Sequence, residues 1–250
     1  MLKEAIEKIA SMAHPEVMEI DGNYFIICPE GAVQIHEDID LPAELNLSSL
    51  DALVKMLRVE ASSISDAAAI GDDGPIFVSV ASHENVFAFM SPGSDTRWQR
   101  PYLYRAKATD VPGWESQVQL GFEQAIVALQ TRFQKSPDFD YAMQLLSQIT
   151  TGGKMTFNDN GIATTIVTQK GVSLASNMAI KPIVTLRPYR TFHEVDQPEG
   201  LFLIRISERG ITFTEADGGM WKLTARKTIK AFLEEQLRPE VDSGKIVVMM

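Results

Sequence analysis

The stretch LFLIRISERGITFTEA, residues 201–216, followed by DGGMWKLTARKTIKAFLEEQL, residues 217–237, decides the fold class. Two apolar runs, 201–207 and 211–216, flank the turn Glu208-Arg209-Gly210, and this pattern predicts a β-hairpin. Between residues 221 and 237 the apolar side chains recur every three or four positions, which predicts an amphipathic helix laid across the hairpin. Such a unit can fold and present a surface without containing any catalytic residue.

The same two periods alternate through the rest of the chain. Apolar residues at helical spacing predict helices at 2–13, at 48–63 with Ser48 as the N-cap and Asp51 completing a capping box, at 115–134, and beyond 136–138. Apolar runs bounded by turn residues predict strands at 24–28, 32–36, 76–80, 86–90, 101–108, 154–157, 162–168, 183–186 and 245–250.

These elements together predict an α+β fold. We expect antiparallel sheets, a helical central segment and a C-terminal hairpin-helix-strand unit. The expected parts are an N-terminal α+β part at 1–110, a helical segment at 111–150 and a C-terminal β-rich part with a closing helix at 151–250; one continuous domain is the alternative. The apolar run at 245–250 is expected to complete the C-terminal sheet or to add to a neighbour's, which makes self-association a hypothesis.

Composition narrows the class of protein. A chain of 250 residues that is 45% hydrophobic can bury a large core without disulfides or a structural metal. No apolar run approaches the roughly 20 residues that span a bilayer, and the first eight residues alternate charges, so we expect a cytoplasmic protein without a membrane partner. The single cysteine, Cys28, is expected to be a small buried side chain.

The formal net charge of −10 argues against a surface for duplex nucleic acid. The acidic residues are scattered among basic ones, so solubility explains this charge better than mimicry of DNA does. The chain lacks the phosphate-binding loop, the dinucleotide-binding glycine motif, HExxH and GxSxG. Its four histidines are far apart in sequence, and we expect neither a cofactor nor a metal.

Two local clusters are candidate ligand-binding sites. The first interleaves cations with aromatic rings, a composition that stacks bases and holds phosphates; it contains Arg97, Trp98, Arg100, Tyr102 and Arg105. Strict strand alternation would place Tyr102 and Arg105 on opposite faces, and an edge strand with half-buried rings is the simpler interpretation. The second repeats the Arg-Pro-Tyr triplet and contains Arg187, Tyr189, Arg190 and His193.

The second cluster has two interpretations. Its cations suit a phosphate or carboxylate. Alternatively, they pair with the nearby acids Glu194, Asp196 and Glu199.

Further along, Asp217 precedes two glycines at the start of the last helix. A carboxylate there is expected to cap the helix rather than to leave room for an anion.

A family resemblance rests on the order of several segments. The segments are, in order, Ser48-Ser49-Leu50-Asp51-Ala52-Leu53-Val54, Ile76-Phe77-Val78, a strand broken by Pro112-Gly113-Trp114 before a Glu/Gln-rich helix, and a β half interrupted by glycines. This order resembles the YfdQ-like prophage family of unknown function over roughly residues 45–170. Segments 187–192 and 215–221 are similar to uncharacterised phage proteins. The resemblance implies a phage or prophage setting in a bacterial host and no site residue.

The leading hypothesis is a non-enzymatic phage accessory protein that self-associates and binds a host or phage macromolecule or a small nucleotide signal, as in anti-defence sequestration. One alternative is an enzyme acting on a phosphate-bearing substrate. Arg187, Arg190 and His193 would then be the clamp and proton carrier, with Glu194 or Glu215 as the base. The other alternative is a single-stranded nucleic-acid-binding protein of a phage recombination region that uses residues 97–105.

Overall fold

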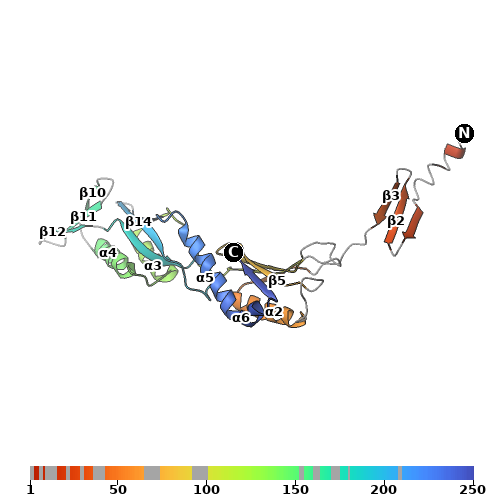
Figure 1. Ribbon diagram of the computed structural model, residues 1–250. Helices are drawn as coiled ribbons and strands as arrows, with labels where there is room; N and C mark the ends of the chain where they lie inside the picture. The colour runs from red at the N-terminus through yellow and green to blue at the C-terminus, as the bar shows by residue number, and fades with distance from the viewer. Residues whose placement is uncertain are drawn as a thin grey trace. The chain divides into compact units, whose positions relative to one another are not determined.

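A computed structural model of the chain describes residues 3–5, 8, 16–20, 23–28, 31–35, 43–64, 74–91, 101–151, 155–159, 164–169, 175–179, 181–207 and 210–250. These residues form the expected α+β fold, shown in Figure 1. The chain separates into two units, Met1–Leu41 and Pro42–Met250. The second unit contains both of the hydrophobic cores found among the described residues.

The first unit contains an antiparallel three-stranded sheet. Its strands in order are β1 (Glu16–Ile20), β2 (Asn23–Cys28) and β3 (Gly31–Ile35). β2 and β3 confirm the strands predicted at 24–28 and 32–36, and they pair antiparallel. Of the predicted helix 2–13, residues 3–5 and 8 are described and are helical; its other residues and the side chain of Cys28 lie outside the described part.

The first sheet of the second unit has the order β16-β5-β6-β7-β4. Its members are β4 (Leu45–Leu47), β5 (Ile76–Val80), β6 (Asn85–Phe89), β7 (Tyr102–Lys107) and β16 (Ile246–Met249). β5, β6 and β7 confirm the strands predicted at 76–80, 86–90 and 101–108, and β6 pairs antiparallel with both of its neighbours. Alternate strand residues share one core with α2 (Leu50–Ser63) and α5 (Met220–Gln236), and α6 (Arg238–Asp242) contacts β16 (Figure 1).

The C-terminal strand does not join the sheet that contains the hairpin predicted at 201–216, so the expectation that it completes the C-terminal sheet is wrong. β16 pairs with β5 in parallel, with Val248 opposite Val78, so the end of the chain completes the sheet built by its N-terminal half. A short helix and a turn after α5 bring the chain back beside β5, which sequence periodicity cannot indicate.

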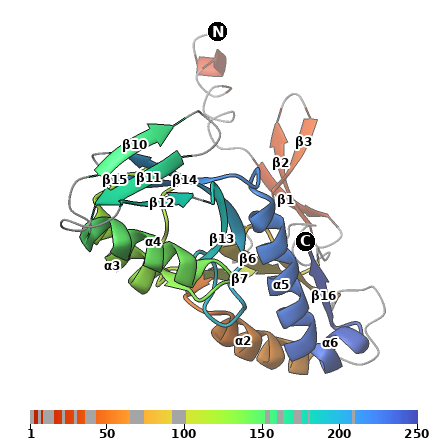
Figure 2. The same ribbon diagram turned by 90° about the vertical axis from the view of Figure 1, so that its left-hand side faces the viewer.

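The second sheet has the order β8-β15-β14-β13-β9. Its members are β8 (Gln119–Leu120), β9 (Phe133–Gln134), β13 (Ile183–Pro188), β14 (Gly200–Ser207) and β15 (Gly210–Glu215). The pairing of β14 with β15 confirms the hairpin that decides the fold class. Helices α3 (Phe122–Arg132) and α4 (Phe139–Thr151) run side by side and bury their apolar faces against this sheet (Figure 2).

The helix expected at 115–134 is wrong at both ends. It begins at Phe122 and ends at Arg132, because the residues before and after it pair as the short edge strands β8 and β9. The close approach of β8 to β15 needs a glycine at position 210, where a Cβ atom would lie 2.0 Å from the carbonyl oxygen of Leu120. Val118, expected on the apolar face of the helix, is exposed.

A third sheet in the second unit consists of β10 (Met155–Asp159), β11 (Thr164–Gln169) and β12 (Ala175–Ala179) in an antiparallel meander. β10 and β11 confirm two of the predicted strands. β12, with the sequence ASNMA, was not predicted because its polar and small residues do not alternate with apolar ones.

The N-terminus of α2 is capped one residue later than predicted. Ser49 Oγ, not that of Ser48, accepts a hydrogen bond from the backbone N–H of Ala52 at 3.2 Å. Glu194 Oε1 accepts from the N–H groups of Leu50 at 2.7 Å and Asp51 at 3.3 Å. A carboxylate 144 residues from Leu50 in the sequence thus satisfies two backbone donors in the first turn of the helix.

Two segments connect the two cores of the second unit. The connection between β13 and β14 starts from a strand whose Val184 and Leu186 belong to the second core, yet Phe192 and Val195 are buried in the first. Helix α5 begins beside this connection and buries Ile229 in the first core (Figure 2). A cleft lies where these segments meet.

Candidate functional site

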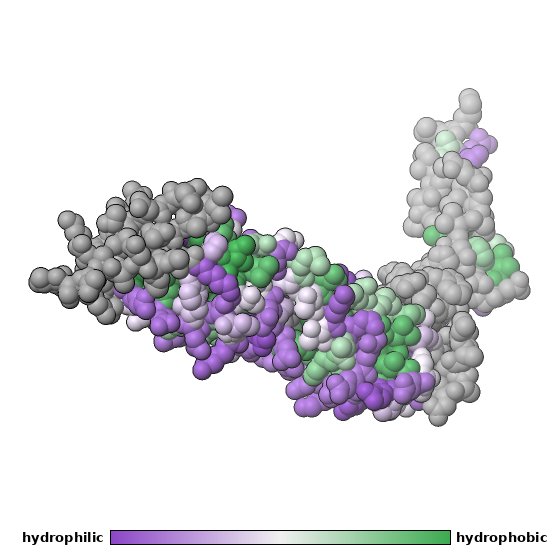
Figure 3. Space-filling view, turned by 60° about the vertical axis from the view of Figure 1, so that its left-hand side comes forward, coloured by the Kyte–Doolittle hydropathy of each residue, from purple (hydrophilic) through white to green (hydrophobic). Residues whose placement is uncertain are grey.

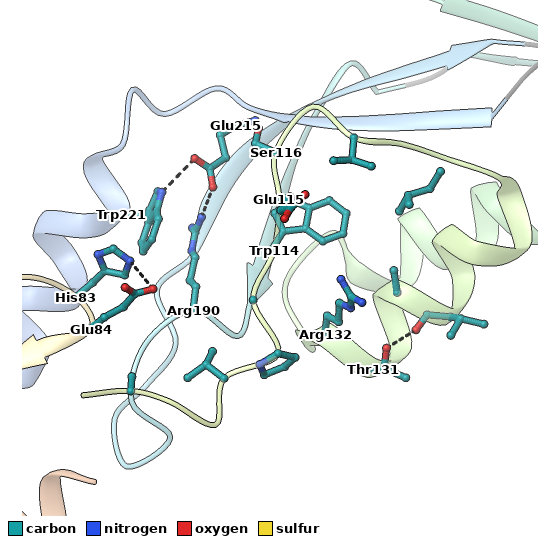
Figure 4. A pocket seen from close by; sticks show the side chains of 18 of the residues that line it. His83, Glu84, Trp114, Glu115, Ser116, Thr131, Arg132, Arg190, Glu215 and Trp221 are labelled. Carbon is teal, nitrogen blue, oxygen red and sulfur yellow. Dashed lines mark hydrogen bonds and ion pairs between the residues drawn. The ribbon is translucent and has the colours of Figure 1, made fainter. Parts of the chain in front are cut away.

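The candidate site is a cleft of about 1000 Å³ in the second unit (Figure 4). Its walls come from the β5–β6 turn, the loop before β8, helix α3, the connection after β13 and the start of α5. Its charged and aromatic lining residues are His83, Glu84, Trp114, Glu115, Glu123, Arg132, Arg190, Glu215, Trp221 and Lys222. A volume of this size accommodates a small molecule of nucleotide dimensions.

Arg190 forms the centre of one wall. Arg190 is 6% exposed; its guanidinium group pairs with Glu215 Oε1 at 2.8 Å and lies over the ring of Trp221 at 3.7 Å from the centroid (Figure 4). Burial lowers the pKa of Arg190 to about 10, and the Glu215 carboxylate opposes that shift. The group therefore stays charged at neutral pH, held between a carboxylate and an aromatic face.

The loop that carries Arg190 is organised by one buried amide. Gln197 Oε1 accepts hydrogen bonds from the backbone N–H groups of Arg190 at 2.9 Å and Thr191 at 3.1 Å. Its Nε2 donates to the carbonyl of Phe192 at 2.9 Å. Because Gln197 is itself 2% exposed, these bonds replace the water that a buried loop would otherwise need.

His83 lies at the edge of Trp221, with a ring-centroid separation of 4.6 Å. Its Nε2 is 3.4 Å from Glu84 Oε1. Burial lowers the pKa of His83; Glu84 opposes this shift, while the charges of Lys222 and Arg190 strengthen it. Lys222 Nζ lies 5.6 Å from the Trp221 centroid, so His83, Arg190 and Lys222 all contact or approach the Trp221 ring.

Two buried donors in the walls lack an acceptor. The indole N–H of Trp114 and the Nε–H of Arg190 meet none among the described residues. Buried polar groups of this kind are uncommon, and an acceptor atom on a bound molecule would satisfy them. The hydroxyls in the cleft are engaged instead: Ser116 Oγ accepts from the N–H of Glu215 at 2.9 Å, and Thr131 Oγ1 donates to the carbonyl of Val127 at 2.8 Å.

The structure separates the members of the second predicted cluster. Arg187 pairs with Glu199 at 2.6 Å, as expected if these cations pair with nearby acids, whereas Arg190 pairs with Glu215. The rings of Tyr189 and His193 are in contact, with centroids 5.7 Å apart, and His193 Nε2 lies 3.2 Å from the carbonyl oxygen of Asp110. Of this cluster, Arg190 alone lines the described cleft.

The acids near that cluster have separate roles. Glu194 caps α2, and Asp217 accepts from the N–H groups of Gly219 at 3.0 Å and Trp221 at 3.3 Å. The prediction that Asp217 caps the last helix is therefore confirmed. The proposed catalytic use of Glu194 or Glu215 stays a prediction; in the structure Glu215 bridges Arg190 and the indole N–H of Trp221.

The first predicted cluster falls elsewhere. Arg97, Trp98 and Arg100 lie outside the described residues. Tyr102 and Arg105 lie on β7 and do not line the cleft.

Sequence reasoning missed His83, Trp114 and Lys222, and it assigned Trp221 to a core. His83 and Trp114 lie more than a hundred positions before Trp221 and Lys222 in the chain, and each residue has an ordinary local explanation as a turn, loop or helix residue. No pattern in the sequence could have joined them.

Among the described residues, no group of three or more His, Cys, Asp or Glu side chains is placed to hold a metal ion. None of the described helices is both long and apolar enough to cross a membrane. Comparison with known proteins gives no significant match to a protein-family model, a curated protein or a solved structure. The chain is thus defined by its α+β fold and its cleft, and the resemblance to the YfdQ-like family stays a prediction.

Proposed function

We propose that the chain is a binding protein that holds a small anionic ligand with a planar ring, of the nucleotide class, in the cleft. The observation that carries the proposal is the gathering of Arg190, His83 and Lys222 around the ring of Trp221. A phosphate placed among these groups would meet two cations and an imidazole that it would help to protonate.

Binding is favoured over catalysis by how the polar groups are used. Arg190 and Glu215 form a buried pair, and the hydroxyls of Ser116 and Thr131 bond to the backbone. The remaining unsatisfied groups in the walls are donors, at Trp114 and Arg190. Donors suit recognition of a phosphate or carbonyl oxygen, and both hydroxyls bond to the backbone rather than to a base that would activate them as nucleophiles.

Isothermal titration with a nucleoside monophosphate, the matching nucleoside and inorganic phosphate tests the proposal. The monophosphate should bind more tightly than either fragment. Lys222→Ala should weaken its binding about tenfold, because a charge-assisted contact contributes about 1.5–3 kcal/mol. Lys227→Ala is the matched control, since Lys227 is exposed on the same helix and does not line the cleft.

The pH dependence of binding gives a second measurement. A bound anion would raise the pKa of His83 from its lowered value, so binding should be accompanied by uptake of a proton. The affinity should therefore increase as the pH falls toward the pKa of His83 in the complex. Equal binding of phosphate and nucleoside, or equal loss in Lys222→Ala and Lys227→Ala, would contradict the proposed site.

Self-association in a phage setting is part of the same proposal. Native mass spectrometry of the protein purified from its host reports the assembly mass and any retained ligand together. A multimer carrying a nucleotide-sized adduct is the expected result for a sequestering protein. A bare monomer would remove both self-association and tight sequestration and would leave transient binding or the enzyme alternative.

A further inference from the structure

The first sheet of the second unit has an aromatic outer face. The helices that contact this sheet, α2, α5 and α6, lie on its other side, where alternate strand residues are buried (Figure 1). The residues between them face away from that core. Four of these are aromatic and form what we call the aromatic face: Phe77 on β5, Phe87 and Phe89 on β6, and Tyr102 on β7.

The four rings form one continuous surface. Phe77 stacks on Phe89 with centroids 5.6 Å apart, and Tyr102 contacts both Phe89 at 5.7 Å and Phe87 at 6.0 Å. The phenylalanines are partly exposed, and Tyr102 is 51% exposed. Exposed apolar side chains occur singly on many proteins, but a contiguous aromatic group marks an interaction surface.

A β-bulge brings a cation onto the same face. The register between β6 and β7 shifts at Ala88 and Phe89, so that Phe89 lies opposite Tyr102 while Ala88 lies opposite Tyr104. Leu103 is the extra residue, and Arg105 therefore lies on the side of Tyr102, with its guanidinium carbon 4.7 Å from the Phe87 centroid. The sequence-based expectation that strand alternation separates Tyr102 from Arg105 is wrong for this reason.

Two cations of β7 lie on the side of the sheet that carries the aromatic face. Arg105 pairs with Glu44 at 3.1 Å, and Lys107 lies opposite Asn85 on the same side of the sheet. A chain with a net charge of −10 thus places stacked rings and cations together on one sheet face.

We propose that the aromatic face binds single-stranded nucleic acid, with bases stacked on Tyr102 and Phe87 and phosphates near Arg105 and Lys107. Rings on an open sheet are a recurring platform for unpaired bases, because every base has a flat apolar face and every linker a negative charge. Association of two copies through this face would instead bring their like-charged cations together. This surface is separate from the cleft, so each proposal can fail alone.

Fluorescence anisotropy with the purified full-length protein tests this inference. The probes are labelled oligodeoxyuridine and oligouridine of about 12 nucleotides, within the usual site size of such surfaces. We expect Tyr102→Ala to weaken binding about tenfold and Tyr102→Phe to retain it, because stacking needs the ring and not the hydroxyl. Leu201→Ala is the matched control, since Leu201 is a 44% exposed residue on the other sheet. The two probes distinguish DNA from RNA through the 2′-hydroxyl.

The salt dependence isolates the phosphate contacts. Lys107→Ala should reduce the slope of log affinity against log salt by about 0.7, whereas Lys135→Ala should leave it unchanged. Absence of binding to both probes at low salt would overturn the proposal, as would equal losses in Tyr102→Ala and Leu201→Ala. Sedimentation in which Tyr102→Ala dissociates a multimer while oligonucleotide binding persists would assign the face to a second copy.

Discussion

Arg190 is the residue on which the cleft depends most. Its charge is buried, so it needs Glu215, Trp221 and the loop organised by Gln197 to hold it in one position. The Arg190 side chain also needs the space beside Gly200 to stay empty. A Cβ atom at position 200 would lie 2.5 Å from Arg190 Nη2, so only glycine fits there while Arg190 keeps its position.

Gly200→Ala should therefore destabilise the protein by about 1–3 kcal/mol, the usual cost of overpacking. Urea unfolding measures this loss. In an Arg190→Met background the same substitution should cost less, because the clashing nitrogen is gone. Additive effects of the two substitutions would show that the guanidinium group does not restrict position 200.

His83 should make stability depend on pH. Because burial lowers its pKa below 6.5, the unfolded chain takes up the proton first as pH falls, and the folded state loses stability below about pH 6.5. His83→Gln should flatten the stability profile between about pH 5 and 7. Denaturant titrations across this range provide the measurement, with His193→Gln at an exposed position as the control. Identical slopes for the wild type and His83→Gln would contradict the expectation.

Helix α2 depends on a cap from a distant segment. Glu194→Ala removes the acceptor for the N–H groups of Leu50 and Asp51 and should lower the free energy of unfolding by about 1 kcal/mol. Glu194→Gln keeps an acceptor oxygen but loses the charge that interacts with the helix dipole, so its loss should be smaller. Chemical denaturation compares both with Asp196→Ala, an exposed neighbour, which should have little effect.

Strand β16 tests the assignment of faces in the first sheet. Val248 is 9% exposed and belongs to the core, whereas the adjacent Val247 is 38% exposed on the outer face. Val248→Thr should cost about 1–3 kcal/mol because it buries a hydroxyl, and Val247→Thr should be nearly neutral. Thermal unfolding of the two variants would contradict the observed register if their effects were equal or reversed.

The second unit as a whole should unfold in one step. On the face that Figure 3 shows, hydrophobic and hydrophilic residues of this unit lie side by side. Its two cores share the connection after β13, which carries Phe192 into the first core, and helix α5, which runs from the cleft into that core. A chain of residues 42–250 should show coincident urea transitions by tryptophan fluorescence and circular dichroism. Two separated transitions would mean that each core unfolds independently.

Local patterns were sufficient to predict many elements of the molecule. The hairpin of β14 and β15 and helix α5 follow from apolar periodicity, because each buries one face against a neighbour close in sequence. The predicted helix boundaries were wrong where pairing with a strand elsewhere in the chain ended the helix. Residues 119–120 are a strand because β15 pairs with them, although their composition fits a helix.

The sequence by itself determined the α+β class, the main hairpins and the Asp217 cap, since these depend on residues within one or two turns of one another. Only the tertiary structure decided that His83, Arg190 and Lys222 lie around Trp221, that Glu194 caps α2, that β16 joins β5, and that a bulge places Arg105 beside Tyr102. The physical reason is the same for all four. Each contact joins a side chain or strand to a partner whose position is set by packing of the cores or by a register shift. Neither packing nor a register shift produces a periodic pattern in the sequence.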